Sequence, residues 1–155
     1  MAKLHDDWIE FLRLLGANRV RFVVVGAHAV AAHGRPRLTA DLDLLVEPTL
    51  DNGRRVVRSL QQFGFSGLDA QSLTQPDVVV FLGREPFRID LLTSIDGVTW
   101  KSAWAGRLRS HLGGVKVAFL GLRQLLRNKR AAGRPKDLAD VALLTEKKRT
   151  RRLTR

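Results

Sequence analysis

Apolar residues along this chain follow two spacings, one at every second position and one at every third or fourth. Short runs of the first kind predict β-strands, and longer stretches of the second kind predict amphipathic helices. The predicted strands are 21–25, 41–46, 78–82, 87–92, 107–112 and 115–120, and the predicted helices are 5–16, 28–33, 50–63, 122–132 and 135–146. The turn residues at 83–86 predict an antiparallel hairpin, and Gly113-Gly114 predicts a second hairpin or a strand-loop-strand.

Two carboxylates interrupt the predicted strand 41–46. Asp41 and Asp43 are separated by one residue, so on a strand both project from the same face, roughly 6.5 to 7 Å apart. That spacing is close enough for the two side chains to share one or two divalent cations. A half-buried strand with an acidic solvent face has the same pattern, and the pair alone does not separate the two interpretations.

A third carboxylate, Asp90, lies inside the apolar run 87–92. Ionised groups in such runs need a cation, a metal or several hydrogen-bond donors, so three acids on two strands indicate a common positive partner. Arg88 is one candidate, because it lies two residues from Asp90 on the same strand face and can form an ion pair with it. Mg²⁺ is the other candidate, since it prefers carboxylate and phosphate oxygens and is often held by one or two acids and the phosphates of a substrate.

Residues that suit phosphate binding precede the first acid pair. A predicted strand ends at Gly26, and a short helix follows, which can bring backbone N–H groups to a phosphate chain. Gly26 alone is equally consistent with a tight turn. Arg35, Arg37 and Thr39 come just before Asp41 and have donors for phosphate oxygens, although a solvated basic loop is an alternative reading, above all for Arg35.

Composition sets the broad class of the protein. A chain of 155 residues with 45% hydrophobic content is long enough for one packed domain and too short for two of normal size. The net charge is +12, and half of it comes from the last nine residues, which hold six cations and no acid. We therefore expect one domain over residues 1–146 and a basic, disordered tail over 147–155. The remaining positive charge favours polyphosphates, RNA or an acidic partner without choosing between them.

The sequence also excludes several classes of protein and site. It contains no cysteine, which rules out disulfide frameworks and thiolate zinc sites and fits a reducing cytoplasm. The first residues lack the apolar region of a secretory signal, and no apolar run approaches the roughly 20 residues that span a bilayer. The sequence therefore predicts a soluble, cytoplasmic protein with no membrane partner.

The combination of motifs resembles a known superfamily. The turn Gly26-Ala27, the pair Asp41 and Asp43, and Asp90 on a later strand are similar to the motifs of the nucleotidyltransferase superfamily with the DNA polymerase β-like fold. Its members share a Gly-Ser turn, an Asp-x-Asp pair, a third acid on a strand, and a lysine and aspartate further along the chain, near the nucleotide.

The resemblance covers most of residues 20–145. Residues 26–46, together with 126–141, are similar to the small bacterial and archaeal branch that includes minimal nucleotidyltransferases and AbiEii-type toxins. The resemblance implies an α+β fold in which a mixed central β-sheet is flanked by helices and followed by a C-terminal helix pair. It also implies a nucleoside triphosphate (NTP) as substrate and two Mg²⁺ ions as cofactors.

The same resemblance implies roles for individual residues. Asp41 and Asp43 would bind the metal ions, and Asp90 would complete the metal-binding triad and position or activate the attacking hydroxyl. One departure from the family pattern concerns the turn, where Ala27 stands in place of the serine whose hydroxyl contacts a nucleotide phosphate. The chain is then either an active enzyme with altered substrate geometry or a nucleotide-binding relic.

Three residues near the C-terminus complete the implied site. Lys129 would face the triphosphate, Asp137 would orient Lys129, and Asp140 would help to hold the nucleotide. A purely structural reason for Asp137 also exists, because an acid in the first turn of a helix offsets the helix macrodipole by a few tenths to about 1 kcal/mol.

The leading functional hypothesis is Mg²⁺-dependent transfer of a nucleoside monophosphate from an NTP to a hydroxyl. The acceptor would be a tRNA end, a protein side chain as in toxin–antitoxin pairs, or a small hydroxylated molecule, and the basic surface slightly favours tRNA. The main alternative is a non-catalytic nucleotide- or RNA-binding module of the same fold, which Ala27 and the cationic tail would suit. A metal-dependent nuclease uses similar acids and is a third possibility.

Overall fold

The computed structural model describes residues 4–35 and 41–154, with side chains as far as residue 146. Its strands are β1 (Phe22–Val25), β2 (Asp41–Val46), β3 (Val79–Leu82), β4 (Arg88–Leu92), β5 (Leu108–Leu112) and β6 (Val115–Phe119). Its helices are α1 (Asp6–Ala17), α2 (Gly26–Ala32), α3 (Leu50–Phe63), α4 (Trp100–Ala105), α5 (Leu122–Ala132) and α6 (Pro135–Thr154), with a short 3₁₀-helix at Ala70–Thr74.

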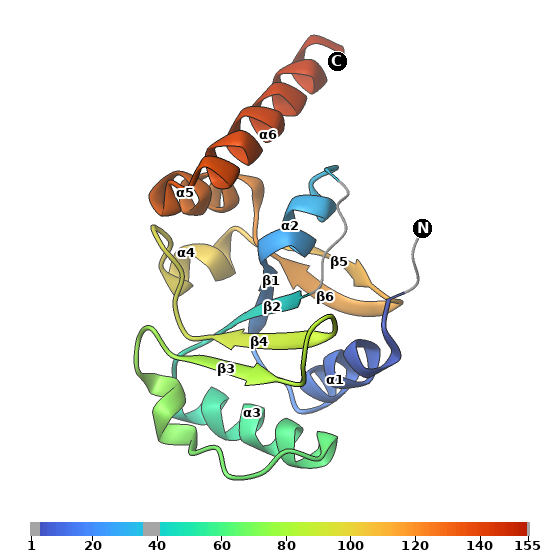
Figure 1. Ribbon diagram of the computed structural model, residues 1–155, viewed down its shortest axis with the longest axis vertical. Coiled ribbons are helices and arrows are strands. Elements are labelled where there is room, and N and C mark those ends of the chain that lie inside the picture. Colours follow the sequence, from blue (N-terminus) through green and yellow to red (C-terminus); the bar gives the residue numbers. More distant parts are fainter. Residues whose placement is uncertain (1–3, 36–40, 155) are drawn as a thin grey trace.

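The strands form one mixed sheet in the order β3-β4-β2-β1-β6-β5 (Figure 1). Both predicted hairpins are confirmed, because β3 pairs antiparallel with β4 and β5 pairs antiparallel with β6. In the centre of the sheet β2 runs antiparallel to β1 and parallel to β4, while β1 runs parallel to β6. The predicted α+β class, with a mixed sheet flanked by helices, is confirmed.

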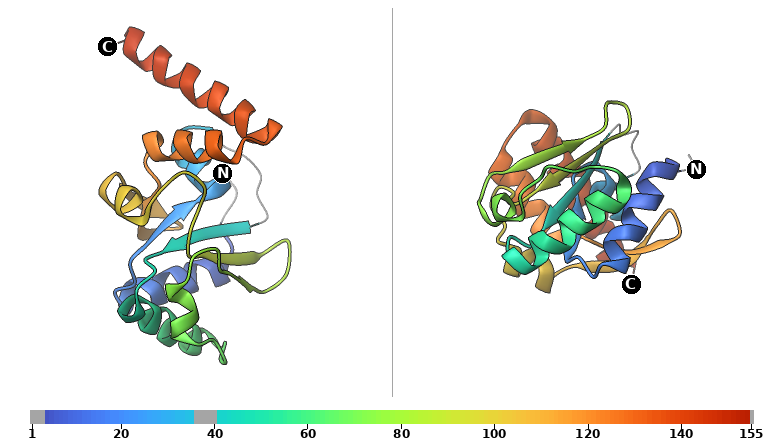
Figure 2. Two further views of the ribbon diagram at one scale, coloured as in Figure 1. Left: turned by 90° about the vertical axis from the view of Figure 1, so that its left-hand side faces the viewer. Right: turned by 90° about the horizontal axis from the view of Figure 1, so that it is seen from below.

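Helices cover both faces of this sheet (Figures 1 and 2). One hydrophobic core forms between the sheet and the pair α1 and α3, and a second forms between the sheet and α2, α4, α5 and α6. Side chains of β2 alternate between the two cores: Leu42 and Leu44 belong to the first, and Leu45 belongs to the second. Asp41 and Asp43 therefore project from the face that carries Leu45, the face of α2 and α5.

Helix α3 shows how closely a sequence pattern can define an element. Its observed bounds equal the predicted range, because Thr49 caps its first turn by accepting a hydrogen bond from the Asn52 backbone N–H and Gly64 ends it in the left-handed conformation. Val56 and Leu60 lie one turn apart on the buried side and pack against the core shared with α1. Helix α3 therefore packs against the face of the sheet opposite the carboxylates.

The C-terminal helix differs from its prediction. The sequence predicts a helix that ends at residue 146 and a disordered tail over 147–155, whereas α6 continues from Pro135 to Thr154. The added segment contains lysine, arginine and leucine, which favour helices, and it has no glycine or proline to stop one. Figure 1 shows this helix projecting away from the sheet. Among the residues described, no helix combines the length and apolar character needed to cross a membrane.

Candidate functional site

Three aspartates lie together on one face of the sheet, as the sequence pattern predicts. Asp43 of β2 is in register with Asp90 of β4, and Asp41 is in register with Arg88. Neighbours in register point to the same face, and so do residues two apart on one strand. The structure thus brings Asp41, Asp43 and Asp90 together, while their roles as metal ligands and catalytic groups stay predictions.

Gly26 brings the start of α2 directly against this group of acids. It follows Val25, which is in register with Asp43, and it adopts a positive φ of 65°. A Cβ atom at this position would overlap the Asp43 carboxylate, so no side chain fits there without movement. The requirement for glycine therefore has two causes, the backbone conformation and the close approach of a carboxylate.

The environment of Asp43 strongly favours its protonated form. Burial, followed by the charge of Asp90 and a hydrogen bond to its carboxylate, raises the pKa of Asp43 to about 7. Burial also raises the pKa of Asp41, against the opposing effect of Arg88. Asp41 and Asp43, whose pKa values are both raised, lie on one surface, and an additional cation would be stabilised beside them.

Arg88 supplies part of the compensating charge. Its Nε donates to Oδ1 of Asp90 at 2.7 Å, and its terminal nitrogen donates to Oδ2 of Asp41 at 3.1 Å. A further contact at 3.3 Å joins it to Glu85. The ion pair considered from the sequence is therefore present and extends to Asp41. Arg88 also lowers the pKa of Asp43, but this effect is smaller than those of burial and Asp90, so the pKa still rises.

The carboxylates of this site fit Mg²⁺ that binds together with a nucleotide better than a metal ion held by protein side chains alone. Within the described part of the chain, no three histidine, cysteine, aspartate or glutamate side chains are grouped closely enough to hold a metal ion by themselves. Asp43 and Asp90 nevertheless offer two adjacent carboxylates, and Mg²⁺ commonly binds one or two acids together with substrate phosphates. Asp43 would have to lose its proton for this binding.

The C-terminal candidates form a separate cluster between α5 and α6. Lys129 is buried, and its Nζ lies 3.2 Å from Oδ1 of Asp137 and 3.3 Å from Oδ2 of Asp140. Arg134 also contacts Asp137, at 2.6 Å. The pKa of Asp137 is lowered, first by the Arg134 hydrogen bond and then by Lys129. The described contacts thus place Lys129 in a buried ion cluster; its predicted contact with a triphosphate stays a prediction.

Other predicted binding residues fall at the beginning and end of α2. Ala27 lies in the first turn of α2, next to Gly26, because α2 begins at Gly26, two residues before its predicted start at residue 28. Arg35 follows α2 and donates a hydrogen bond to the Leu143 carbonyl of α6, so it has a structural contact. Arg37 and Thr39 lie outside the described residues.

Phe81 lies beside the acids and is not among the residues predicted for the site. It is in register with Asp90 across the β3–β4 hairpin, and Arg88 lies over its ring. The predicted hairpin, with its turn at 83–86, would pair Leu82 with Phe87 and place Val79 opposite Asp90. The observed register pairs Leu82 with Ile89 instead and so places Phe81 opposite Asp90.

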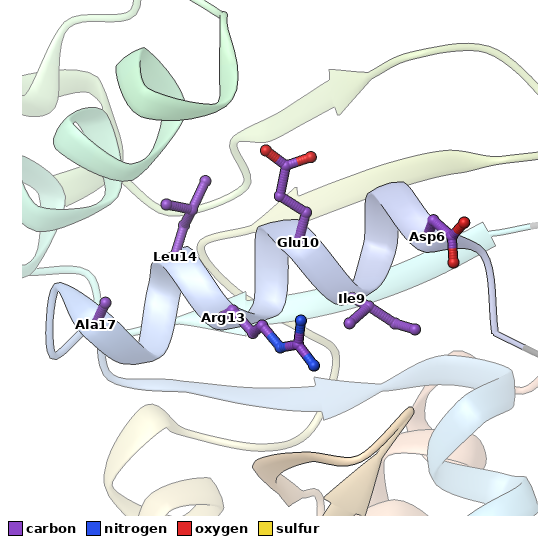
Figure 3. A pocket seen from close by; sticks show the side chains of 6 residues that line it. All are labelled: Asp6, Ile9, Glu10, Arg13, Leu14 and Ala17. Carbon is purple, nitrogen blue, oxygen red and sulfur yellow. The ribbon is translucent and has the colours of Figure 1, made fainter.

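A hollow of about 520 Å³ lies elsewhere, on the surface of α1 (Figure 3). Its lining residues all come from that helix or its end, namely Asp6, Ile9, Glu10, Arg13, Leu14 and Ala17. Glu10 and Leu14 point to one side of the helix and Ile9 and Arg13 to the other, so these side chains do not converge on a ligand. The aspartate group is the stronger candidate site.

Comparison with known proteins agrees with this fold. A crystal structure of a candidate nucleotidyltransferase from Thermotoga maritima matches with a TM-score of 0.55 and 17% sequence identity, covering 96% of this chain and 91% of that one. At this identity the match supports the fold alone. A comparison with curated proteins gives no match. Residues 4–154 match the family model described as "nucleotidyl transferase of unknown function (DUF2204)", and the chain therefore belongs to that nucleotidyl transferase family.

Proposed function

We propose that this protein is a Mg²⁺-dependent nucleotidyltransferase that moves a nucleoside monophosphate from an NTP to a hydroxyl group. The observation that carries the proposal is the hydrogen-bonded pair Asp43 and Asp90, of which the Asp43 carboxyl group lies directly beside the Gly26 turn. A carboxyl group whose pKa is raised by neighbouring like charges is typical of a functional site. Such a group does little to stabilise the fold. Membership of a nucleotidyl transferase family supports the same chemistry.

The proposed reaction is an in-line displacement at the α-phosphorus. The acceptor oxygen forms a new O–P bond, the bond between the α-phosphorus and the bridging oxygen breaks, and pyrophosphate leaves. Asp90 would orient the acceptor hydroxyl and receive its proton, and Asp41 and Asp43 would bind the metal ions. Magnesium, when bound, would stabilise the negative charge on the attacking and leaving oxygens. The glycine turn would let the phosphate chain approach the backbone closely, in the absence of the family serine at Ala27.

The acceptor is proposed as a tRNA end, a protein hydroxyl or a small hydroxylated molecule. A chain with a net charge of +12 attracts polyanions, which favours tRNA among these three. Residues 26–46 and 126–141 resemble minimal nucleotidyltransferases and AbiEii-type toxins, and this resemblance supports a role in a toxin–antitoxin pair. The partner would then be a protein acceptor or an antitoxin. The proposed location is the cytoplasm, because that compartment supplies NTPs and these acceptors.

Transfer of label from α-³²P-labelled NTPs tests this function. The protein would be incubated with each labelled NTP, Mg²⁺ and either total tRNA or cell extract, and the macromolecular products would be separated by electrophoresis. We expect label in one product class with wild type and none with Asp43→Asn. Equal labelling by both proteins, or none by wild type with any NTP, would contradict the proposal. RNA degradation without added NTP would instead identify a nuclease.

A non-catalytic nucleotide- or RNA-binding module is the second candidate. Two observations favour it, the ion pairs that Arg88 already makes with Asp41 and Asp90, and the missing hydroxyl at Ala27. Calorimetry distinguishes the two candidates. The module predicts RNA binding with a steep salt dependence and no Mg²⁺ requirement for NTP binding, whereas the enzyme predicts NTP binding that requires both Mg²⁺ and Asp43.

A further inference from the structure

An exposed aromatic ring continues the row of acids across the sheet. Phe81 of the edge strand β3 is in register with Asp90, which is in register with Asp43. Side chains opposite each other in paired strands project from the same face, with Cβ atoms about 4.5–5.5 Å apart. The ring of Phe81 is therefore next to the acids, and its side chain is 60% exposed, the highest value among the large hydrophobic residues that stand out at the described surface.

Arg88 links this ring to the carboxylates. The guanidinium carbon of Arg88 lies 4.6 Å from the centre of the Phe81 ring, while its nitrogens contact Asp90 at 2.7 Å and Asp41 at 3.1 Å. The guanidinium of Arg88 lies over the Phe81 ring, so a face of the ring is open to contact with a planar group. The Arg88 side chain therefore reaches from the ring to the acids. In a nucleotide, the ribose likewise separates the base from the phosphates.

We propose that Phe81 is the stacking surface for a nucleobase, either the base of the NTP or the terminal base of a nucleic-acid acceptor. The proposal rests on the function proposed above, since it requires the phosphate to lie at Asp43 and Asp90. Every base has a π-face, and a phenylalanine ring has no hydrogen-bonding group. Phe81 therefore strengthens binding without selecting strongly among bases.

The chain provides matched variants for a test. Phe81→Ala and Phe81→Leu remove the aromatic ring, and Phe81→Trp retains a stacking surface. Phe87→Ala is the control, because Phe87 lies immediately before β4 in the same hairpin, is 51% exposed, and stacks on His5, next to α1, with 4.1 Å between the ring centres. Its removal deletes an exposed ring of equal size away from the carboxylate face.

Calorimetry would measure binding of two Mg²⁺ complexes, one of an adenosine triphosphate analogue with a methylene group between the α- and β-phosphates and one of inorganic tripolyphosphate. We expect Phe81→Ala and Phe81→Leu to weaken binding of the analogue by on the order of ten-fold and to leave tripolyphosphate binding unchanged. Phe81→Trp and Phe87→Ala should bind both ligands as wild type does. A second titration with a short single-stranded RNA identifies the source of the base, because an acceptor site would lose RNA affinity and retain affinity for the analogue.

Three results would overturn the assignment. The first is unchanged binding of both the analogue and the RNA in Phe81→Ala. The second is a fall in tripolyphosphate affinity equal to the fall for the analogue, since a ligand without a base cannot stack. The third is a change from dimer to monomer in sedimentation of Phe81→Ala, which would show that a second copy covers the ring. Failure of wild type to bind Mg²⁺-tripolyphosphate would instead count against the proposed transferase site, and the RNA titration would still measure stacking.

Discussion

Asp43 and Asp90 lie opposite each other on parallel strands β2 and β4, and Asp43 donates a hydrogen bond to the Asp90 carboxylate when it is protonated. Two carboxyl groups in such contact cannot both be ionised without a counter-charge nearby. Arg88 reaches Asp90 from one side, yet the pKa of Asp43 remains at about 7. Near neutral pH the ionised pair would therefore need more positive charge close by than Arg88 and the other described side chains provide.

The first prediction concerns pH and stability. Asp43 binds its proton more tightly in the folded protein, with a pKa of about 7 against an ordinary value of 3.8, so its ionisation opposes folding. Its contribution to the free energy of unfolding should be greatest below pH 4, fall as the pH rises toward 7, and stay low above that. Asp43→Asn cannot ionise and should flatten this dependence. At pH 8 we expect it to stabilise the metal-free protein by about 1 kcal/mol, raising Tm by about 2–4 °C.

Thermal unfolding at pH 5 and pH 8 in the presence of a chelator would measure this effect. Mg²⁺ affinity should change in the opposite direction, rising with pH up to about 7 because the ion competes with the Asp43 proton. Equal Tm differences between Asp43→Asn and wild type at both pH values would show that Asp43 titrates normally.

The second prediction concerns Arg88. Its guanidinium occupies Asp90 and Asp41, so an incoming Mg²⁺ has to compete with it for the same oxygens. Arg88→Gln should therefore bind Mg²⁺ several-fold more tightly in the absence of nucleotide, while the metal-free protein unfolds at a lower temperature. Calorimetry with MgCl₂ measures the first effect. Arg84→Gln, an exposed position in the same hairpin, controls for the loss of one charge, and weaker Mg²⁺ binding by Arg88→Gln would contradict the competition.

The third prediction separates the two reasons for a glycine at position 26. Gly26→Ala introduces both a strained positive φ and a Cβ that overlaps Asp43, whereas Gly64→Ala introduces only the strain, since nothing lies within 4 Å of its Cβ. Positive φ at a non-glycine residue costs roughly 1–2 kcal/mol. Gly64→Ala should be destabilised by about that amount and Gly26→Ala by more, because its Cβ also displaces the Asp43 carboxylate. Only Gly26→Ala should lose Mg²⁺–NTP binding, measured by calorimetry. Normal binding by Gly26→Ala would mean that the α2 turn does not form part of the site.

The fourth prediction concerns Lys129. Removing one partner of a buried ion cluster leaves charge without compensation and costs about 3–5 kcal/mol, so Lys129→Met should lower Tm by roughly 10 °C. Adding Asp140→Asn should recover part of the loss, because Asp137 keeps its contact with Arg134. Arg134→Met is the control, since Arg134 is 72% exposed and its pair contributes at most about 1 kcal/mol. Differential scanning calorimetry of the four proteins would test this, and a Tm for Lys129→Met close to that of wild type would exclude a structural role for the cluster.

Local pattern was enough to predict the six strands, most of the helices and the face of the acids, but not the short helices Ala70–Thr74 and Trp100–Ala105. The range 50–63 was correct because its cap and its glycine stop lie within the sequence segment, and Asp41 and Asp43 share a face because alternation along a strand is a local property. The placement of Asp90 beside Asp43 required the pairing of β2 with β4, which are separated by a helix and a hairpin strand. The strand pattern indicated a common positive partner for the three acids and the family resemblance implied the triad, and the strand order provides its physical basis.

Contacts between distant segments could not be predicted in this way. That Arg88 contacts Asp41 as well as Asp90 depends on the register between two strands 47 residues apart. The burial that raises the pKa of Asp43 depends on the helices packed over that face, and the position of Phe81 beside the acids depends on the exact pairing of a hairpin. The length of α6 was missed because a run of basic residues is compatible with both a helix and a disordered end.

A co-crystal with Mg²⁺ and a non-hydrolysable NTP tests the central claim most directly, namely that three aspartates on one sheet face bind a metal–nucleotide complex. We predict Mg²⁺ density coordinated by Asp43 together with Asp41, Asp90 or both, with the triphosphate against the turn at Gly26 and Ala27. Anomalous scattering from Mn²⁺ in place of Mg²⁺ would identify the metal positions. Nucleotide bound at another surface, or bound at this turn with Arg88 still paired to Asp90 and no metal at Asp43, would contradict the account.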